Sequence, residues 1–110
     1  MLQFLLQLIS TPITDPYIQK KWASPTAQVE WVIRAEAEGK MNVQKALDIA
    51  QCESSLGLNK VNPISSARGV YQFIDSTWEH YCDGDVMNDR DNVKCFVELY
   101  SKNPTWWECI

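Results

Sequence analysis

The chain has 110 residues, which is enough for one small domain and leaves no room for a second hydrophobic core. Ten basic and fourteen acidic residues give a net charge of −4, so the basic stripe of a nucleic-acid-binding protein is missing. Hydrophobic residues make up 45% of the sequence, a fraction that supports a folded core and excludes disorder on composition. Five tryptophans are many for this length, so some of them are expected to line a groove for ring-shaped ligands.

Residues 1–25 are expected to form an N-terminal segment and connector, followed by one domain over residues 26–110. Met1–Ile9 is apolar but too short to cross a membrane, which takes about 20 residues. It also lacks the basic start of a signal peptide. Two interpretations stay open, a shortened export segment and a helix packed on the domain, and contact with a membrane or a larger assembly would come through this segment. Thr11–Pro25 contains three prolines and predicts an irregular connector.

Capping signals and apolar spacing predict the first two helices. Ser24 followed by Pro25 is typical of a helix start, and Gly39 is expected to end that helix. Asn42 can cap the second helix, whose apolar residues recur at helical spacing until Gly57 marks its end.

Two further helices are predicted in the second half of the chain. The capping-box pattern from Ser76 to Glu79 predicts the start of the third. Pro104 limits the fourth, whose apolar face is Val93, Phe96, Val97 and Tyr100. The apolar run Gly69–Ile74 between the second and third helices is expected to be extended or strand-like. The predicted fold class is therefore mainly α, a small α+β domain with a short irregular or β stretch in its middle.

The four cysteines indicate the redox compartment. Cys52, Cys82, Cys95 and Cys109 include no Cys-x-x-Cys pair and are accompanied by one histidine, which argues against a structural zinc site. An even cysteine count in a small domain favours two disulfides in an oxidising, extracytoplasmic compartment. The alternative is four buried free thiols in a cytosolic protein.

An acidic loop is predicted before the fourth helix. It contains four carboxylates that could suggest calcium, Asp83, Asp85, Asp89 and Asp91. They lack the order and the closing glutamate of an EF-hand, so a solvated loop is the preferred interpretation and no metal is expected.

Glu53 is the candidate for chemistry. It lies seven residues after Ala46, which places it on the apolar face of the second predicted helix and in its last turn. Desolvation and the negative end of the helix should both raise its pKa. A carboxylic acid that stays protonated near neutral pH can protonate a glycosidic oxygen. The plainer alternative is a solvated or salt-bridged glutamate.

Several short motifs stand in a suggestive order: Ala50-Gln-Cys-Glu53-Ser-Ser55, Asn62-Pro63, Ala67-Arg-Gly-Val-Tyr-Gln-Phe-Ile74, Ser76-Thr-Trp78, and Asn92 opening the last helix. From about Ala27 to the C-terminus the chain resembles the lytic transglycosylase domain, a peptidoglycan-cleaving family of the lysozyme-like superfamily. The resemblance implies a lysozyme-like helical domain of the goose-lysozyme type.

The cysteine placement is similar to that of the resuscitation-promoting-factor domains, which are also lysozyme-like cell-wall enzymes. In that family a cysteine just before the catalytic glutamate is bonded to one just after a C-terminal tryptophan. The similarity implies a Cys52–Cys109 disulfide, which leaves Cys82 to pair with Cys95.

The transglycosylase resemblance implies roles for single residues. Glu53 matches the catalytic acid/base, and Ser54 matches a serine that helps to fix the carboxylate. Gln72 and Ile74 match residues that line the saccharide cleft. Asn62 falls where a residue contacts the N-acetyl group of the substrate.

Two tyrosines depart from the family pattern. Tyr71 replaces a methionine, and both stacking against a sugar and a place in the core stay open for it. Tyr100 is one residue off the family's tyrosine on the last helix and is expected to take over its hydrogen bond to the catalytic acid.

The other aromatic side chains have plainer expectations. Trp78 is expected in the core and His80 on the surface at a helix end. Trp106 and Trp107 either anchor the tail or form the rim of the cleft.

The mechanism implied by the resemblance cleaves the bond between N-acetylmuramic acid and N-acetylglucosamine in peptidoglycan glycan strands, with no cofactor. Glu53 would protonate the bridging oxygen, and then accept the proton of the muramic 6-hydroxyl as it closes a 1,6-anhydro ring. One alternative is a hydrolytic muramidase on the same fold, in which Asp75 or Glu79 would hold a water. A second is a non-catalytic cell-wall binding module.

Overall fold

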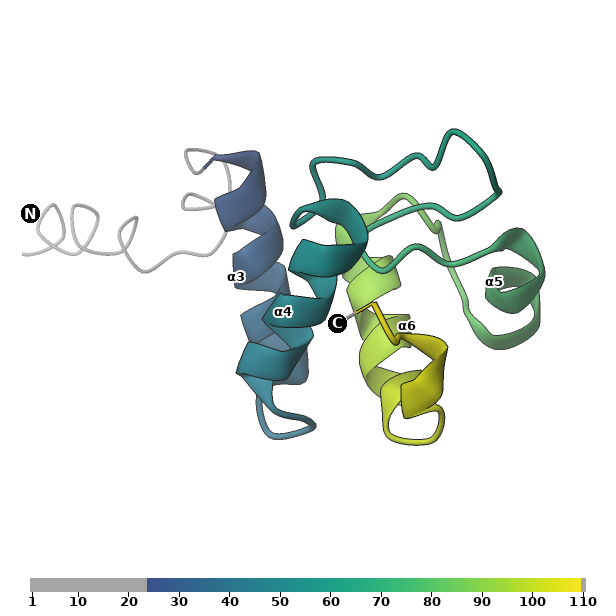
Figure 1. Cartoon of the computed structure of the whole chain (residues 1–110). Coiled ribbons are helices and arrows are strands. Elements are labelled where there is room, and N and C mark those ends of the chain that lie inside the picture. The colour runs from purple at the N-terminus through teal and green to yellow at the C-terminus, as the bar shows by residue number, and fades with distance from the viewer. Residues whose placement is uncertain (1–23, 110) are drawn as a thin grey trace, which may run out of the picture.

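The computed structural model describes residues 24–109, and the expectations for Met1–Ile9 and most of the connector lie outside that range. The described chain is mainly helical, as predicted (Figure 1). Its elements are α3 (Pro25–Ala37), α4 (Val43–Ser54), α5 (Asp75–Tyr81), α6 (Asp89–Tyr100) and the 3-10 helix η1 (Pro104–Trp106). Helix α3 packs against both α4 and α6, and η1 packs against α6.

The starts of α3 and α4 are confirmed. Ser24 caps α3, where its Oγ accepts a hydrogen bond from the Ala27 N–H at 3.3 Å, and Pro25 is the first helical residue. Asn42 caps α4 and accepts from the Lys45 N–H at 2.8 Å. Each cap satisfies a backbone donor that has no partner inside its helix, so both starts are specified locally.

Helix α4 ends in a left-handed turn. Ser55 and Leu56 have φ values of 52° and 53°, and the helix stops at Ser54, ahead of the predicted Gly57. Gly57 follows at φ +83°, and a Cβ there would lie 2.8 Å from Cγ2 of Val29. A glycine is therefore needed for α3 to approach this turn.

The core forms where α3, α4 and α6 meet and extends to α5 and the tail. The ring of Tyr71 stacks on Phe96 with centroids 3.6 Å apart and planes at 3°. Trp107 meets the Phe96 ring edge-on at 4.9 Å. Trp78 is buried, as predicted, and its indole N–H donates to the Gly84 carbonyl at 3.2 Å. The helices contribute buried side chains that include Val29, Val32, Ile33, Ala46, Ile49, Ala50 and Val93.

The middle segment corrects the strand-like expectation for Gly69–Ile74. This run forms a tight turn, and β pairing in the described chain is limited to two isolated antiparallel bridges, Val61 with Arg68 and Arg68 with Phe73. Gly69 and Gln72 both adopt positive φ, at 84° and 54°, which reverses the chain where an extended run was expected.

The capping-box prediction for the third helix is wrong. Helix α5 begins at Asp75, and Ser76 lies inside its first turn. The Asp75 N–H donates to Oγ of Ser66 at 3.0 Å, and the Asp75 carboxylate pairs with Arg68 at 2.7 Å. Tertiary contacts therefore set this helix start in place of a local cap.

The fourth helix starts earlier than predicted. Asn88 caps α6 and accepts from the Asp91 N–H at 3.0 Å, so Asp89 and Asp91 belong to its first turn and not to the acidic loop. Asn92 is a buried residue within the helix and does not open it.

Both predicted disulfides are present, and the free-thiol alternative is excluded. Cys52–Cys109 joins the last turn of α4 to the C-terminal tail, with Cα atoms 5.9 Å apart. Cys82–Cys95 joins the residue after α5 to the middle of α6, with Cα atoms 5.7 Å apart. Each helix of the described range falls short of the length and apolar character that a membrane span requires.

Candidate active site

Glu53 lies in the last turn of α4, one residue after Cys52 and one before the buried Ser54. Its side chain is half-buried, and burial raises the pKa of the Glu53 carboxyl above its ordinary value because desolvation disfavours the charged form. Within residues 24–109 no hydrogen bond or ion pair to this carboxyl is formed. The Glu53 carboxyl is thus partly desolvated and has no partner within this range, so the salt-bridged glutamate of the plainer interpretation is not found among the described residues.

The C-terminal tail is held beside this helix end. The Cys52–Cys109 bond attaches it to α4, and the indole N–H of Trp107 donates to the Tyr71 carbonyl at 3.0 Å. Trp107 is buried, whereas Trp106 remains 44% exposed. The two tryptophans therefore divide the roles left open by the sequence: Trp107 anchors the tail, and Trp106 forms a rim.

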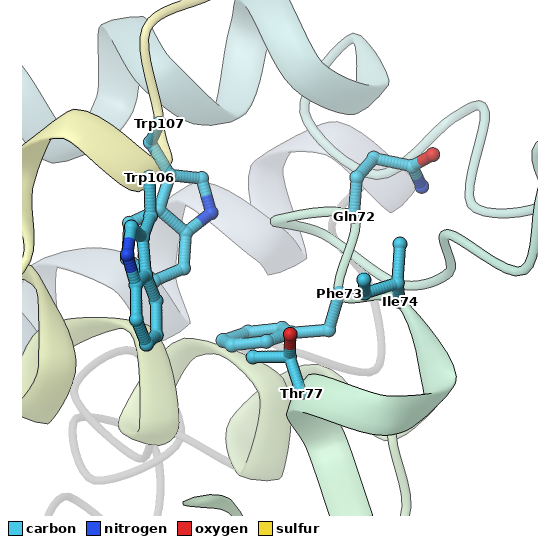
Figure 2. A pocket seen from close by; sticks show the side chains of 6 residues that line it. All are labelled: Gln72, Phe73, Ile74, Thr77, Trp106 and Trp107. Carbon is cyan, nitrogen blue, oxygen red and sulfur yellow. The ribbon is translucent and has the colours of Figure 1, made fainter.

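A pocket of about 320 Å³ opens beside the tail. Figure 2 shows its two walls, with the tryptophans on one side and the turn that leads into α5 on the other. Glu53 is not one of the lining residues. Its neighbour Cys52 is bonded to Cys109, two residues after Trp107, and its neighbour Ser54 donates to the carbonyl of Val70, two residues before Gln72. The lining consists of Gln72, Phe73, Ile74, Thr77, Trp106 and Trp107.

Ser54 is buried and makes backbone contacts. Its hydroxyl donates to the Val70 carbonyl at 2.7 Å and accepts from the Gly57 N–H at 2.9 Å. The buried side chain offers no surface to a substrate, and its hydrogen bonds go to backbone groups and not to the Glu53 carboxylate that it was expected to fix. Ser54 instead ties the end of α4 to the turn that forms the pocket wall.

Tyr71 does not stack on a ligand. Its side chain is 0% exposed, and its hydroxyl donates to the Ala46 carbonyl at 2.8 Å. Burial raises the pKa of the Tyr71 phenol, which stays protonated. Of the two alternatives, the core position is the one found, and the substrate-binding assignment of Tyr71 is wrong.

Gln72 and Ile74 both line the pocket, on the wall opposite the tryptophans. Ile74 is 46% exposed at the rim. The Gln72 carboxamide turns away from the tryptophans in Figure 2, and its Nε2 donates to the carbonyls of Lys60 and Gly69 at 3.1 and 2.9 Å. Gln72 therefore shapes the wall through backbone contacts and presents mainly its stem to the pocket.

Asn62 and Tyr100 are not brought to the pocket. The carboxamide oxygen of Asn62 accepts from the N–H groups of Ile64 and Ser65 and closes a loop turn. The Tyr100 ring packs near Phe96 and Trp107. The expected hydrogen bond from Tyr100 to Glu53 is not formed.

Asn92 has a positioning role that the sequence pattern did not reveal. Its Oδ1 accepts from the Tyr71 N–H at 2.8 Å, and its Nδ2 donates to the Val86 carbonyl at 2.8 Å. A Cβ on Gly69 would lie 2.1 Å from this Nδ2, so Gly69 is required by close approach as well as by its positive φ. Thr77 was also missed, although its spacing of three residues from Ile74 places both on one face at the start of α5.

A second pocket of about 250 Å³ lies between the end of α5 and α6. Two nearby carboxylates accept hydrogen bonds from the backbone of the loop before α6: Asp91, in the first turn of α6, accepts from the Asp85 N–H, and Asp85 accepts from the Met87 N–H. Within residues 24–109 no set of three or more His, Cys, Asp or Glu side chains is arranged to hold a metal ion. His80 is exposed at the end of α5, as predicted.

Comparison of the chain with protein-family models, with curated proteins and with solved structures yields no match. The functional assignment therefore rests on the sequence motifs and on the geometry around Glu53.

Proposed function

We propose that this domain is an extracytoplasmic lytic transglycosylase of the lysozyme-like type, which cleaves peptidoglycan glycan strands with Glu53 as its acid/base. The observation that carries the proposal is the half-buried Glu53 carboxyl without a partner among the described residues, at a helix end locked by the Cys52–Cys109 bond. A pKa raised by burial suits a group that must deliver a proton near neutral pH. Two disulfides agree with an oxidising compartment.

The proposed reaction uses Glu53 twice. As an acid it protonates the oxygen between N-acetylmuramic acid and N-acetylglucosamine while the muramic N-acetyl oxygen assists from within the substrate. As a carboxylate it then takes the proton of the muramic 6-hydroxyl, whose oxygen closes on the anomeric carbon. The product carries a 1,6-anhydro end, and the proton returns to Glu53, so no water is consumed.

The pocket beside the tail has the composition of a glycan site. Trp106 and Ile74 offer apolar surface to a pyranose face, and the Thr77 hydroxyl offers a hydrogen bond. Among residues 24–109, none that lines it carries a charge. The hydrolytic alternative needs a second acid to hold a water, and Asp75, one candidate for it, is engaged by Arg68 at 2.7 Å.

A binding module without catalysis is the remaining alternative. Placing a carboxyl where burial raises its pKa costs stability whenever that carboxyl is ionised. Binding alone would gain nothing from this arrangement, whereas proton transfer requires it.

Digestion of purified peptidoglycan, followed by mass spectrometry of the muropeptides, tests the proposal. Anhydro ends are lighter by one water than hydrolysed ends, so the masses separate transglycosylase from muramidase. Glu53→Gln should lower the rate at least about a thousandfold, because both proton transfers pass through one group, while the fold and wall binding persist.

Glu38→Gln is the matched control, because Glu38 is an exposed glutamate at the end of α3 and should be neutral. Near-wild-type cleavage by Glu53→Gln would eliminate both enzymatic assignments. Binding of the wall with no turnover by the wild type would support the binding module.

A further inference from the structure

Tyr81 and Trp106 form an exposed aromatic surface that begins at the Trp106 rim of the first pocket and continues to Tyr81, which does not line that pocket. Their side chains are 51% and 44% exposed, which is high for rings of this size. Tyr81 is the last residue of α5, Trp106 is the last residue of η1, and their ring centroids are 5.3 Å apart. His80 meets the Tyr81 ring edge-on at 4.4 Å. We call the Tyr81–Trp106 pair the aromatic ridge.

The covalent structure of the protein holds the ridge in place. Cys82, the residue after Tyr81, is bonded to Cys95 of α6. Cys109, three residues after Trp106, is bonded to Cys52. Rings that are fixed before a ligand arrives lose little conformational entropy on binding, so an exposed ridge of this kind is suited to recognition.

The ridge also connects the two pockets described above. Trp106 lines the pocket of the proposed active site, and Tyr81 lines the second pocket. Because the two rings lie 5.3 Å apart, a ligand that leaves the first pocket past Trp106 meets Tyr81 next.

Charge indicates which ligand fits this path. The second pocket carries three carboxylates and one lysine: Asp83, Asp91, Glu98 and Lys94. This balance disfavours an anionic occupant, such as a peptide rich in carboxylates or a polyphosphate. It suits a neutral ligand whose apolar face stacks on the rings and whose hydroxyl groups donate to carboxylate oxygens, which describes a pyranose ring.

We propose that the aromatic ridge is an accessory glycan subsite that binds a pyranose unit of the strand beyond the units held in the pocket. The identity of the glycan rests on the proposed function. The ridge would raise affinity for long strands and would leave the chemical step at Glu53 unchanged.

The test measures binding of neutral chito-oligosaccharides of increasing length by calorimetry, with the full chain carrying Glu53→Gln to prevent turnover. Affinity should rise with length until the ridge is occupied. Tyr81→Ala should remove the last increment, a loss of about threefold to tenfold for the longest probe, and should leave the shortest probe unaffected. Tyr81→Phe keeps the ring and should retain most of the affinity.

Ile64→Ala is the matched control, because Ile64 is an apolar side chain that is 94% exposed and lines neither pocket. In the otherwise wild-type chain, Tyr81→Ala should raise KM on long strands and leave kcat on short fragments unchanged. Equal affinity of Tyr81→Ala and the parent for all probes, or an equal loss in Ile64→Ala, would overturn the proposal. If the wild type cleaves no peptidoglycan, the proposed function fails, but a length-dependent loss in Tyr81→Ala still supports the ridge as a glycan surface.

Discussion

The helices α3, α4 and α6 and the segment between α4 and α6, residues 55–88, are held by different kinds of interaction. The three helices carry side-chain caps at their own N-termini, at Ser24, Asn42 and Asn88, and bury one apolar face. Apart from α5, the segment has almost no regular pairing and depends on helix side chains, above all Ser54 and Asn92, which bind its backbone. Local signals thus specify the helices, and contacts between distant residues specify the segment.

The candidate site lies on the border of these two regions. Glu53 belongs to a helix whose start is capped locally, so its position depends on strong local signals. The pocket walls belong to the segment and the tail, so their positions depend on tertiary contacts. Changes in the segment should therefore disturb the pocket more than they disturb Glu53.

The largest effect on stability is expected from the disulfides, which join the C-terminal tail to α4 and the segment to α6. Replacing Cys52 and Cys109 together by alanine should lower the free energy of unfolding by about 4 kcal/mol, because the bond closes the longer loop. Replacing Cys82 and Cys95 should cost about 3 kcal/mol. Urea unfolding of both double variants measures the difference. If removal of Cys82–Cys95 lowered the free energy of unfolding more than removal of Cys52–Cys109, loop closure would not be what determines the stabilisation by these bonds.

Asn92→Ala tests whether the segment depends on helix side chains. The substitution leaves the buried Tyr71 N–H and Val86 carbonyl without their partner and should cost about 2 to 4 kcal/mol. Asn88→Ala in the same helix removes only an exposed N-cap and should cost about 1 kcal/mol. Thermal unfolding of the pair compares a tertiary bond with a local one. If both variants lost the same free energy of unfolding, the segment would not depend on tertiary hydrogen bonds more than the helices depend on their local caps.

Two substitutions of Gln72 separate the effect of its side-chain hydrogen bonds from the effect of its positive φ. Gln72→Ala loses two hydrogen bonds to backbone carbonyls while keeping φ at 54°. Gln72→Gly loses the same bonds but tolerates this φ, so it should be more stable than the alanine variant by about 1 kcal/mol. Chemical denaturation of both variants decides this. If alanine proves the more stable, the positive φ at this position is not retained in solution.

The smallest expected effect is a pH dependence of the free energy of unfolding, which comes from Glu53 in α4. Burial raises the folded pKa of Glu53, so the folded state binds more protons than the unfolded state between about pH 4.3 and that raised pKa. This contribution to stability is present below the unfolded pKa and is lost as pH rises through the folded pKa. Glu53→Gln should therefore gain stability relative to the wild type across this interval and then level off, as measured by unfolding at several pH values. A constant difference would indicate an ordinary, solvated carboxyl.

The sequence by itself determined the features that depend on near neighbours. The caps at Ser24 and Asn42, the helical class and the apolar-face position of Glu53 all follow from spacing within a few residues. Cysteine count and motif order were enough to indicate the two disulfides and a single candidate acid.

Only the tertiary structure decided the rest, because the deciding partners lie far along the chain. Tyr71 turns into the core since Asn92, 21 residues later, binds its N–H and the Ala46 carbonyl binds its hydroxyl. The start of α5 is set by Ser66 and Arg68, which overrides the capping pattern at Ser76. The spacing of residues within a short stretch of sequence does not predict such contacts. The pocket and the aromatic ridge could therefore be identified only from the tertiary structure.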